Sequence, residues 1–216
     1  MSGGRLVALG DACLSFQFGQ TIDPDVNARC VALAALVEGR GIPGVRDVVP
    51  SYHAVTIHFD PRVTDLRVLD REVRALAASA EAAADRGTRI VEVPVSYGGA
   101  AGPDLADVAA FARCSEAEVV RLHTATVYRV YMLGFLPGFA YMGSVDPRIA
   151  MPRLDAPRLR VASGSVGIAG RQTGIYPCEA PGGWRILGRT AIALFDPARV
   201  EPFLLKAGDR VRFVAG

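Results

Sequence analysis

The chain has 216 residues, of which half are hydrophobic and 21% are charged, and its formal net charge is +2. This composition is typical of a soluble globular protein and excludes a disordered one. Its length allows one substantial core or two smaller ones. The net charge is too small to indicate nucleic acid as a partner. Lys206 is the only lysine, which argues against a lysine-based phosphate loop or Schiff base.

Several kinds of segment and site are not indicated by the sequence. No stretch approaches the eighteen apolar residues of a membrane span, so no membrane partner is expected. The first residues lack the charged and apolar regions of a secretion signal. The four cysteines form no C-x-x-C pair and have no histidine at zinc-ligand spacing, so no metal site is expected. We therefore expect a cytoplasmic protein with free thiols.

The first part of the chain predicts alternating strands and helices. Apolar alternation across Arg5–Phe18, broken by a Gly-Asp pair, indicates a hairpin. A helix is expected to open at Asp23-Pro24 and to stop by Gly41. Two strands are expected within residues 45–59, followed by an amphipathic helix from about Asp65. These elements predict a compact α+β domain.

Small and polar residues at 82–88 are typical of a linker. We therefore predict an α+β N-terminal domain over residues 1–86 and a second domain over residues 87–216. The second domain should begin with a strand at 90–97, followed by a short helix from Pro103-Asp104 and by another that starts at the capping-box pattern Ser115 to Glu118. From about 126 it should continue as short strands separated by Gly and Pro. Many short strands with few helices favour a small closed barrel.

The stretch from Gly134 to Thr190 carries most of the functional signal. Glycine and proline interrupt it every few residues, so long helices are excluded. Ordering so much irregular backbone costs conformational entropy, and a binding site is the usual reason for it.

His123 lies upstream of this stretch, at the expected end of a short helix. Imidazole chemistry suits a catalytic proton carrier near neutral pH, although the side chain would serve equally as a helix cap or in packing.

Gln172 and Thr173 lie between two glycines, which let the backbone approach a ligand closely. The glutamine amide both donates and accepts, as a cyclic amide does, so we predict a catalytic role for Gln172 and substrate binding by Thr173. Stabilisation of a turn is the alternative. Tyr176 offers a hydroxyl and a stacking face to the same substrate.

Four more residues complete the predicted site. Arg189 is a candidate catalytic residue that would clamp a carboxylate, or else form a structural ion pair. Phe139 and Tyr141 would form an apolar wall for a small ring, unless they are core residues. Trp184, the only tryptophan, follows a Pro-Gly-Gly turn and would anchor a protein interface or plug the barrel end.

The motifs of this region resemble the KipI family, whose members are also called 5-oxoprolinase B-type subunits or allophanate hydrolase subunit 1. The matching elements are G-F-x-P-G-F-x-Y-x-G from Gly134, D-P-R-x-A-x-P-R from Asp146, G-S-V-x-I-A-G-x-Q-T-G-I-Y-P from Gly164 and P-G-G-W-x-x-x-G-R-T from Pro181. One departure is Ser163, preceded by Ala, where the family commonly has Pro-Ala. The resemblance implies a cyclophilin-like barrel.

The resemblance also implies a function. The chain would be the B-type subunit of an ATP-dependent 5-oxoprolinase, which opens the small cyclic amide 5-oxo-L-proline to L-glutamate, and would be inactive alone. Its implied partners are a C-type subunit, held closely, and an A-type subunit. ATP would be used by the complex, and the sequence does not say which of the subunits binds it. Two alternatives stay open: a KipI-like inhibitor of a histidine kinase, and a subunit of a urea- or allophanate-metabolising amidolyase.

Overall fold

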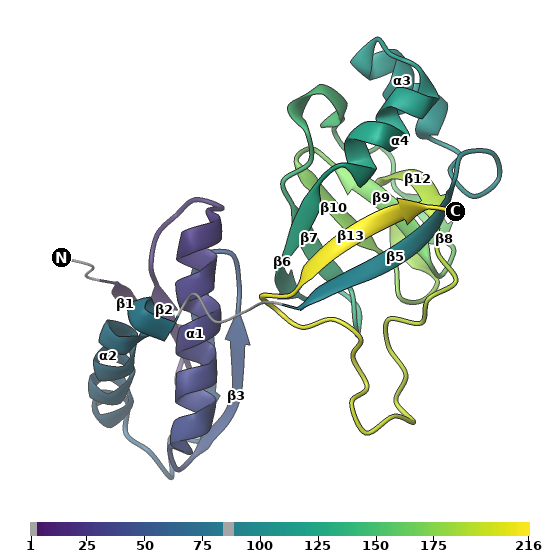
Figure 1. Ribbon diagram of the computed structural model, residues 1–216. Coiled ribbons are helices and arrows are strands. Elements are labelled where there is room, and N and C mark those ends of the chain that lie inside the picture. The colour runs from purple at the N-terminus through teal and green to yellow at the C-terminus, as the bar shows by residue number, and fades with distance from the viewer. Residues whose placement is uncertain (1–3, 84–88) are drawn as a thin grey trace. The chain divides into compact units, whose positions relative to one another are not determined.

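A computed structural model describes residues 4–83 and 89–216 (Figure 1). The chain divides into two compact units, Met1–Gly87 and Thr88–Gly216. The expected boundary at residue 86 lies outside the described residues and stays a prediction. An α+β unit followed by a mainly β barrel is the fold class that the sequence predicts, and this is confirmed.

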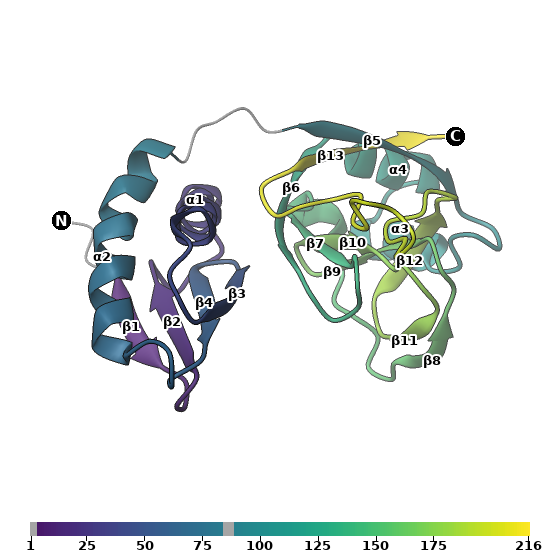
Figure 2. The ribbon, with the colours of Figure 1, turned by 90° about the horizontal axis from the view of Figure 1, so that it is seen from below.

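The first unit is a four-stranded sheet with two helices packed on it (Figure 2). The strand order is β1-β2-β4-β3, all antiparallel. The elements are β1 (Arg5–Ala8), β2 (Cys13–Gln17), α1 (Pro24–Arg40), β3 (Val45–Pro50), β4 (Ala54–Phe59) and α2 (Leu66–Ala83). The Asp23 carboxylate caps α1, and Gly41 ends it in the left-handed conformation. The expected hairpin, helix boundaries and strand pair are therefore confirmed.

The second unit is built on a closed barrel of seven strands in the order β10-β7-β6-β13-β5-β12-β9. The pair β5–β13 is parallel and the other pairs are antiparallel. The barrel strands are β5 (Ile90–Tyr97), β6 (Val127–Leu133), β7 (Ala140–Gly143), β9 (Ser165–Ala169), β10 (Gln172–Ile175), β12 (Arg185–Arg189) and β13 (Arg210–Ala215). A separate two-stranded sheet joins β8 (Arg158–Val161) to β11 (Ala180–Gly182).

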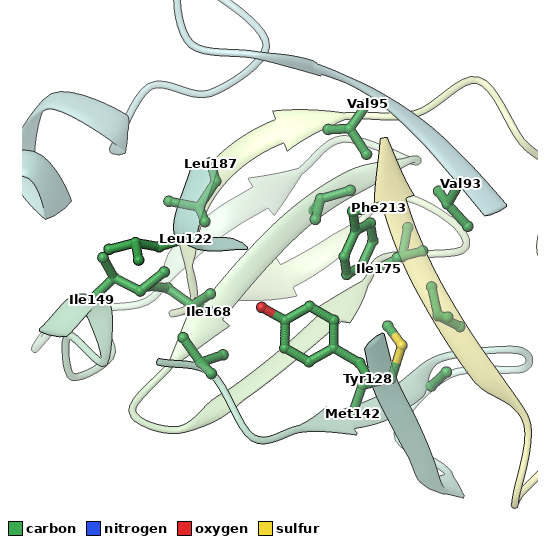
Figure 3. Close-up of a cluster of buried hydrophobic side chains, with 14 of the residues drawn as sticks. Val93, Val95, Leu122, Tyr128, Met142, Ile149, Ile168, Ile175, Leu187 and Phe213 are labelled. Atoms are coloured by element: carbon green, nitrogen blue, oxygen red, sulfur yellow. The ribbon is translucent and has the colours of Figure 1, made fainter. Parts of the chain in front are cut away.

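The barrel interior is filled by apolar side chains from all seven strands (Figure 3). Alternate residues of a strand point to opposite faces, so every second position enters the core. Figure 3 labels ten of the buried side chains, which are Val93, Val95, Leu122, Tyr128, Met142, Ile149, Ile168, Ile175, Leu187 and Phe213. The barrel is therefore a packed core.

Two short helices, α3 (Leu105–Ala112) and α4 (Glu116–Thr124), lie at one end of the barrel (Figure 1). Ser115 caps α4 through the backbone N–H of Glu118, as the sequence predicts. A single 3-10 turn, η1, follows at Pro147–Ile149. Across residues 4–83 and 89–216, no helix has the length and apolarity needed to cross a membrane.

Candidate functional site

Gln172 and Thr173 are neighbours in β10, but their side chains lie on opposite faces of the strand. Thr173 is fully buried and, like Ile175, faces the barrel interior. Gln172 is half-buried and belongs to the opposite, outer face, because successive side chains alternate along a strand. The structure therefore does not bring these two side chains together around one small ring.

His123 joins Thr173 on the inner side. The imidazole comes from the last turn of α4, is fully buried, and stacks on Phe213 with ring centroids 4.6 Å apart. Its Nδ1 lies 2.7 Å from the hydroxyl oxygen of Tyr97, and its Nε2 lies 2.9 Å from Oγ1 of Thr173. The Thr173 hydroxyl is also 3.0 Å from the carbonyl oxygen of Gly167. We call Tyr97, His123, Thr173 and Gly167 the inner chain.

Hydrogen-bonding chemistry fixes the tautomer of His123. The Gly167 carbonyl can only accept, so Thr173 gives it the single hydroxyl proton. Oγ1 of Thr173 must then accept a proton from Nε2 of His123. Nδ1 is left unprotonated and accepts from the Tyr97 hydroxyl. Every polar group of the inner chain is thereby satisfied.

Burial lowers the pKa of His123 to about 3, from an ordinary value of 6.5, because the charged ring would lose its hydration. Burial also raises the pKa of Tyr97 far above its ordinary value of 10. The imidazole therefore stays neutral at physiological pH with both nitrogens bonded. This geometry gives His123 a part in holding the fold, and its predicted role as a proton carrier stays a prediction.

Four of the predicted site residues, Phe139, Tyr141, Tyr176 and Trp184, pack together on the outer face of the barrel, and we call them the outer cluster. The Phe139 ring is at the centre, with centroids 4.8 Å from Tyr141, 5.2 Å from Tyr176 and 5.4 Å from Trp184. The last two contacts are edge-to-face, a favourable geometry for aromatic rings. The sequence thus identified residues that are contiguous in space.

Two glycines make room for the outer cluster. Gly174 on β10 is directly opposite Gly167 on β9. A Cβ on Gly174 would lie 3.1 Å from a ring atom of Phe139 and 3.1 Å from one of Trp184. A Cβ on Gly167 would lie 3.3 Å from Cβ of Trp184. The glycine pair therefore lets the aromatic rings lie directly against the barrel wall.

Phe139, Tyr176 and Trp184 are the deep members of the cluster, 1%, 1% and 8% exposed, and the substrate-binding roles expected of Phe139 and Tyr176 stay predictions. Burial raises the pKa of Tyr176, opposed by a hydrogen bond from the Trp184 backbone. Little of the Trp184 side chain is open to a partner in this chain taken alone. Its expected role as an interface anchor stays a prediction.

Arg189 is bonded to the backbone of a neighbouring turn. It is exposed at the end of β12, and its Nε–H donates to the Ser163 carbonyl at 2.8 Å. It is four positions along the chain from Arg185, which follows Trp184, and this is about 13 Å along a strand. Its predicted role as a carboxylate clamp stays a prediction.

The role of Asp104 is not evident from the sequence. Pro103-Asp104 indicates only a helix start, but the Asp104 side chain makes no cap hydrogen bond to α3. This buried carboxylate accepts instead from the Ile186 backbone N–H and from Arg158, both at 2.7 Å. Asp104 therefore links β12, through Ile186, to β8, through Arg158. No pattern along the chain pairs residues 54 positions apart, so sequence reasoning could not find this contact.

Donor sets for metals are a separate question. Within the described ranges, no three His, Cys, Asp or Glu side chains gather in a way that could hold a metal ion.

Residues 5–205 match the family model described as carboxyltransferase domain, subdomain C and D. A curated relative from Bacillus subtilis, the B-type subunit of 5-oxoprolinase, is 42% identical over 97% of this chain and 92% of its own length. The chain belongs to the family of 5-oxoprolinase B-type subunits. The resemblance seen in the motifs is therefore confirmed.

Solved structures support the same family fold. The crystal structure of TTHA0988 aligns with 94% of this member of the family at 40% identity and a TM-score of 0.85. The chain spans only 40% of that longer protein. The urea carboxylase of Kluyveromyces lactis aligns with 99% of the chain at a TM-score of 0.77 but only 20% identity, with 22% of its own length covered, which shows the fold alone.

Proposed function

We propose that this chain is the B-type subunit of an ATP-dependent 5-oxoprolinase that opens 5-oxo-L-proline to L-glutamate. The observation that carries the proposal is the 42% identity, over nearly the full length of both chains, to a relative named as that subunit of 5-oxoprolinase. The outer cluster supports it at one point: Tyr141 is half-buried and lies on the same outer face as the half-buried Gln172, while the other three rings are buried.

Within this proposal, Gln172 contacts the lactam. Its amide N–H₂ donates to the ring carbonyl, and its amide oxygen accepts from the ring N–H. The inner chain fixes β10 from the other side through Thr173, which holds the backbone of Gln172 in place. Amides are poor electrophiles, and ATP supplies the driving force by activating the amide oxygen.

Among the described residues, neither the lysine nor the glycine-rich stretch forms a phosphate-binding site for ATP. Lys206 is exposed, and its Nζ pairs with Glu201 at 2.8 Å. The glycines at 164, 167 and 170 lie in β9 and the turns that flank it, and they do not form a loop leading into a helix. We therefore propose that ATP is bound by the C-type or A-type partner, and that the isolated chain turns over neither ATP nor 5-oxoproline.

The proposal is tested by reconstituting the complex with all three subunits and with each subunit left out in turn. The chain is mixed with C-type and A-type subunits, and glutamate and ADP are measured together. Both products should form only when all three subunits are present. Glutamate formation at full rate without this chain would refute its role in the complex. Robust ATP hydrolysis by the chain alone would refute the assignment of ATP to a partner.

The kinase-inhibitor and urea alternatives are not preferred. The similarity to urea carboxylase is 20% in sequence, which supports a shared fold but no shared substrate. The same three-subunit mixture, supplied with urea or allophanate in place of 5-oxoproline, should therefore give no product.

A further inference from the structure

Arg153 lies in a segment that backbone hydrogen bonds hold against the outer face of the barrel. On one side, the Gly170 N–H donates to the Met151 carbonyl at 2.8 Å. On the other side, the Leu154 N–H donates to the Gly183 carbonyl at 2.7 Å. The first anchor is in the turn leading into β10, and the second directly precedes the tryptophan of the outer cluster. The backbone of Arg153 is therefore fixed between the Gln172 strand and the cluster.

The charge of Arg153 acts on two residues of that cluster. Burial raises the pKa of Tyr141 and of Tyr176, and the positive charge of Arg153 opposes the rise at both hydroxyls. The charge of Arg153 therefore favours the ionised form of both hydroxyls, as a guanidinium held on the same side of the barrel would. Tyr141 is half-buried and lines the same face.

Arg153, like Arg171 and Arg189, has no acidic partner among the described residues, whereas two nearby arginines have one. Arg148 pairs with Asp146 at 2.8 Å, and Arg158 pairs with Asp104 at 2.7 Å. Arg153 is exposed, and its guanidinium forms no such pair within residues 4–83 and 89–216. A guanidinium presents a planar fork of N–H donors that fits a carboxylate.

We propose that Arg153 binds the carboxylate of a small cyclic amide whose ring lies on Tyr141 and whose amide meets Gln172. The identity of the ring rests on the proposed function, while the carboxylate specificity rests on Arg153. This assigns the clamp to Arg153, at the cluster, rather than to Arg189 at the far end of β12. The ligand class is a five-membered lactam with an attached carboxylate.

The test is direct binding to the full chain, measured by calorimetry with 5-oxoproline and with pyrrolidin-2-one, the same lactam without its carboxylate. The wild-type chain should bind 5-oxoproline at least about tenfold more tightly than it binds pyrrolidin-2-one. Arg153→Gln should raise the Kd for 5-oxoproline about tenfold to a hundredfold, as expected for losing a hydrogen bond to a charged group, and leave pyrrolidin-2-one unaffected. Arg160→Gln, which removes an exposed arginine paired with Glu179, is the control and should leave both affinities unchanged.

Three outcomes would overturn the site: no binding of 5-oxoproline to the wild-type chain, equal loss in both arginine variants, or Arg153→Gln that binds as the wild type does. Melting temperatures of the two variants should match the wild type, since both side chains are exposed. Reconstituted activity separates this proposal from the previous one. Arg153-dependent binding without turnover by the complex would refute the 5-oxoprolinase function and keep the site. Turnover by the complex with an unchanged KM in Arg153→Gln would refute the Arg153 site and keep the 5-oxoprolinase function.

Discussion

His123 donates its Nε2 proton to the hydroxyl of Thr173 across 2.9 Å in the interior of the barrel. The two residues are 50 positions apart, and the bond joins the last turn of α4 to β10. It places a polar pair within an apolar core, where an unpaired member would be costly. The bond therefore holds β10 in place from the barrel interior, while Gln172 of the same strand lies on the outer face.

The pH dependence of stability should report the buried imidazole. The pKa of His123 is about 3 in the folded protein and about 6.5 when unfolded, so between these values the unfolded chain binds the extra proton. Stability is then present in full above pH 6.5 and falls as the pH falls towards 3, by at most about 1.4 kcal/mol per pH unit from this group. Imidazole NMR should show the Nε2–H tautomer without titration above about pH 4.5. A titration midpoint of His123 near pH 6.5 would contradict its burial in the inner chain.

Thr173→Val should destabilise the barrel by about 1–3 kcal/mol in urea unfolding. The substitution keeps the shape but leaves the Nε2–H of His123 without its acceptor and removes the hydrogen bond to the Gly167 carbonyl. Thr173→Ser keeps the hydroxyl and is the control, with a smaller loss from the missing methyl group. Equal stability of the valine variant and the wild type would show that the inner chain does not hold the fold.

Gly174→Ala should lower stability by about 1–3 kcal/mol, because the new methyl group would press on the rings of Phe139 and Trp184. Gly39→Ala is the matched control. Gly39 is in α1 with nothing within 4 Å of an added Cβ, so this change should raise helix stability by up to about 1 kcal/mol. Similar small gains in both variants would mean that the outer cluster is not packed on the glycine pair.

Trp184→Ala should cost about 3–5 kcal/mol of fold stability, since the side chain is 8% exposed and contacts Phe139 edge-to-face. Melting temperature and affinity for the C-type subunit are measured on the same variant. An affinity weaker by about tenfold with an unchanged melting temperature would instead support the interface role that the sequence predicts.

The sequence was most informative where local patterns decide structure. Asp23 and Gly41 bound α1 as expected, and Ser115 caps α4 as expected. Alternation and glycine spacing led to a barrel, and the motif residues Phe139 and Trp184 meet in space. The caps and strands rest on the backbone preferences of a few adjacent residues.

Longer-range relations were beyond those patterns. The pairing of His123 with Thr173 and of Asp104 with Arg158 depends on the closure of the barrel. Gln172 and Thr173 are adjacent in the sequence, yet strand alternation assigns them to opposite faces once residue 172 is known to begin β10. The glycine-rich sequence around residue 172 does not itself show where the strand begins.

The most direct test of the account is the effect of Gln172→Ala on glutamate formation by the reconstituted complex. The outer face of β10 should serve the reaction, so the rate should fall about tenfold to a hundredfold while the melting temperature stays near that of the wild type. Gln17→Ala, which removes a strand glutamine from β2 of the other unit, is the control and should leave the rate unchanged. A wild-type rate in the Gln172 variant, or a large fall in its melting temperature with catalysis intact in the folded fraction, would contradict the account.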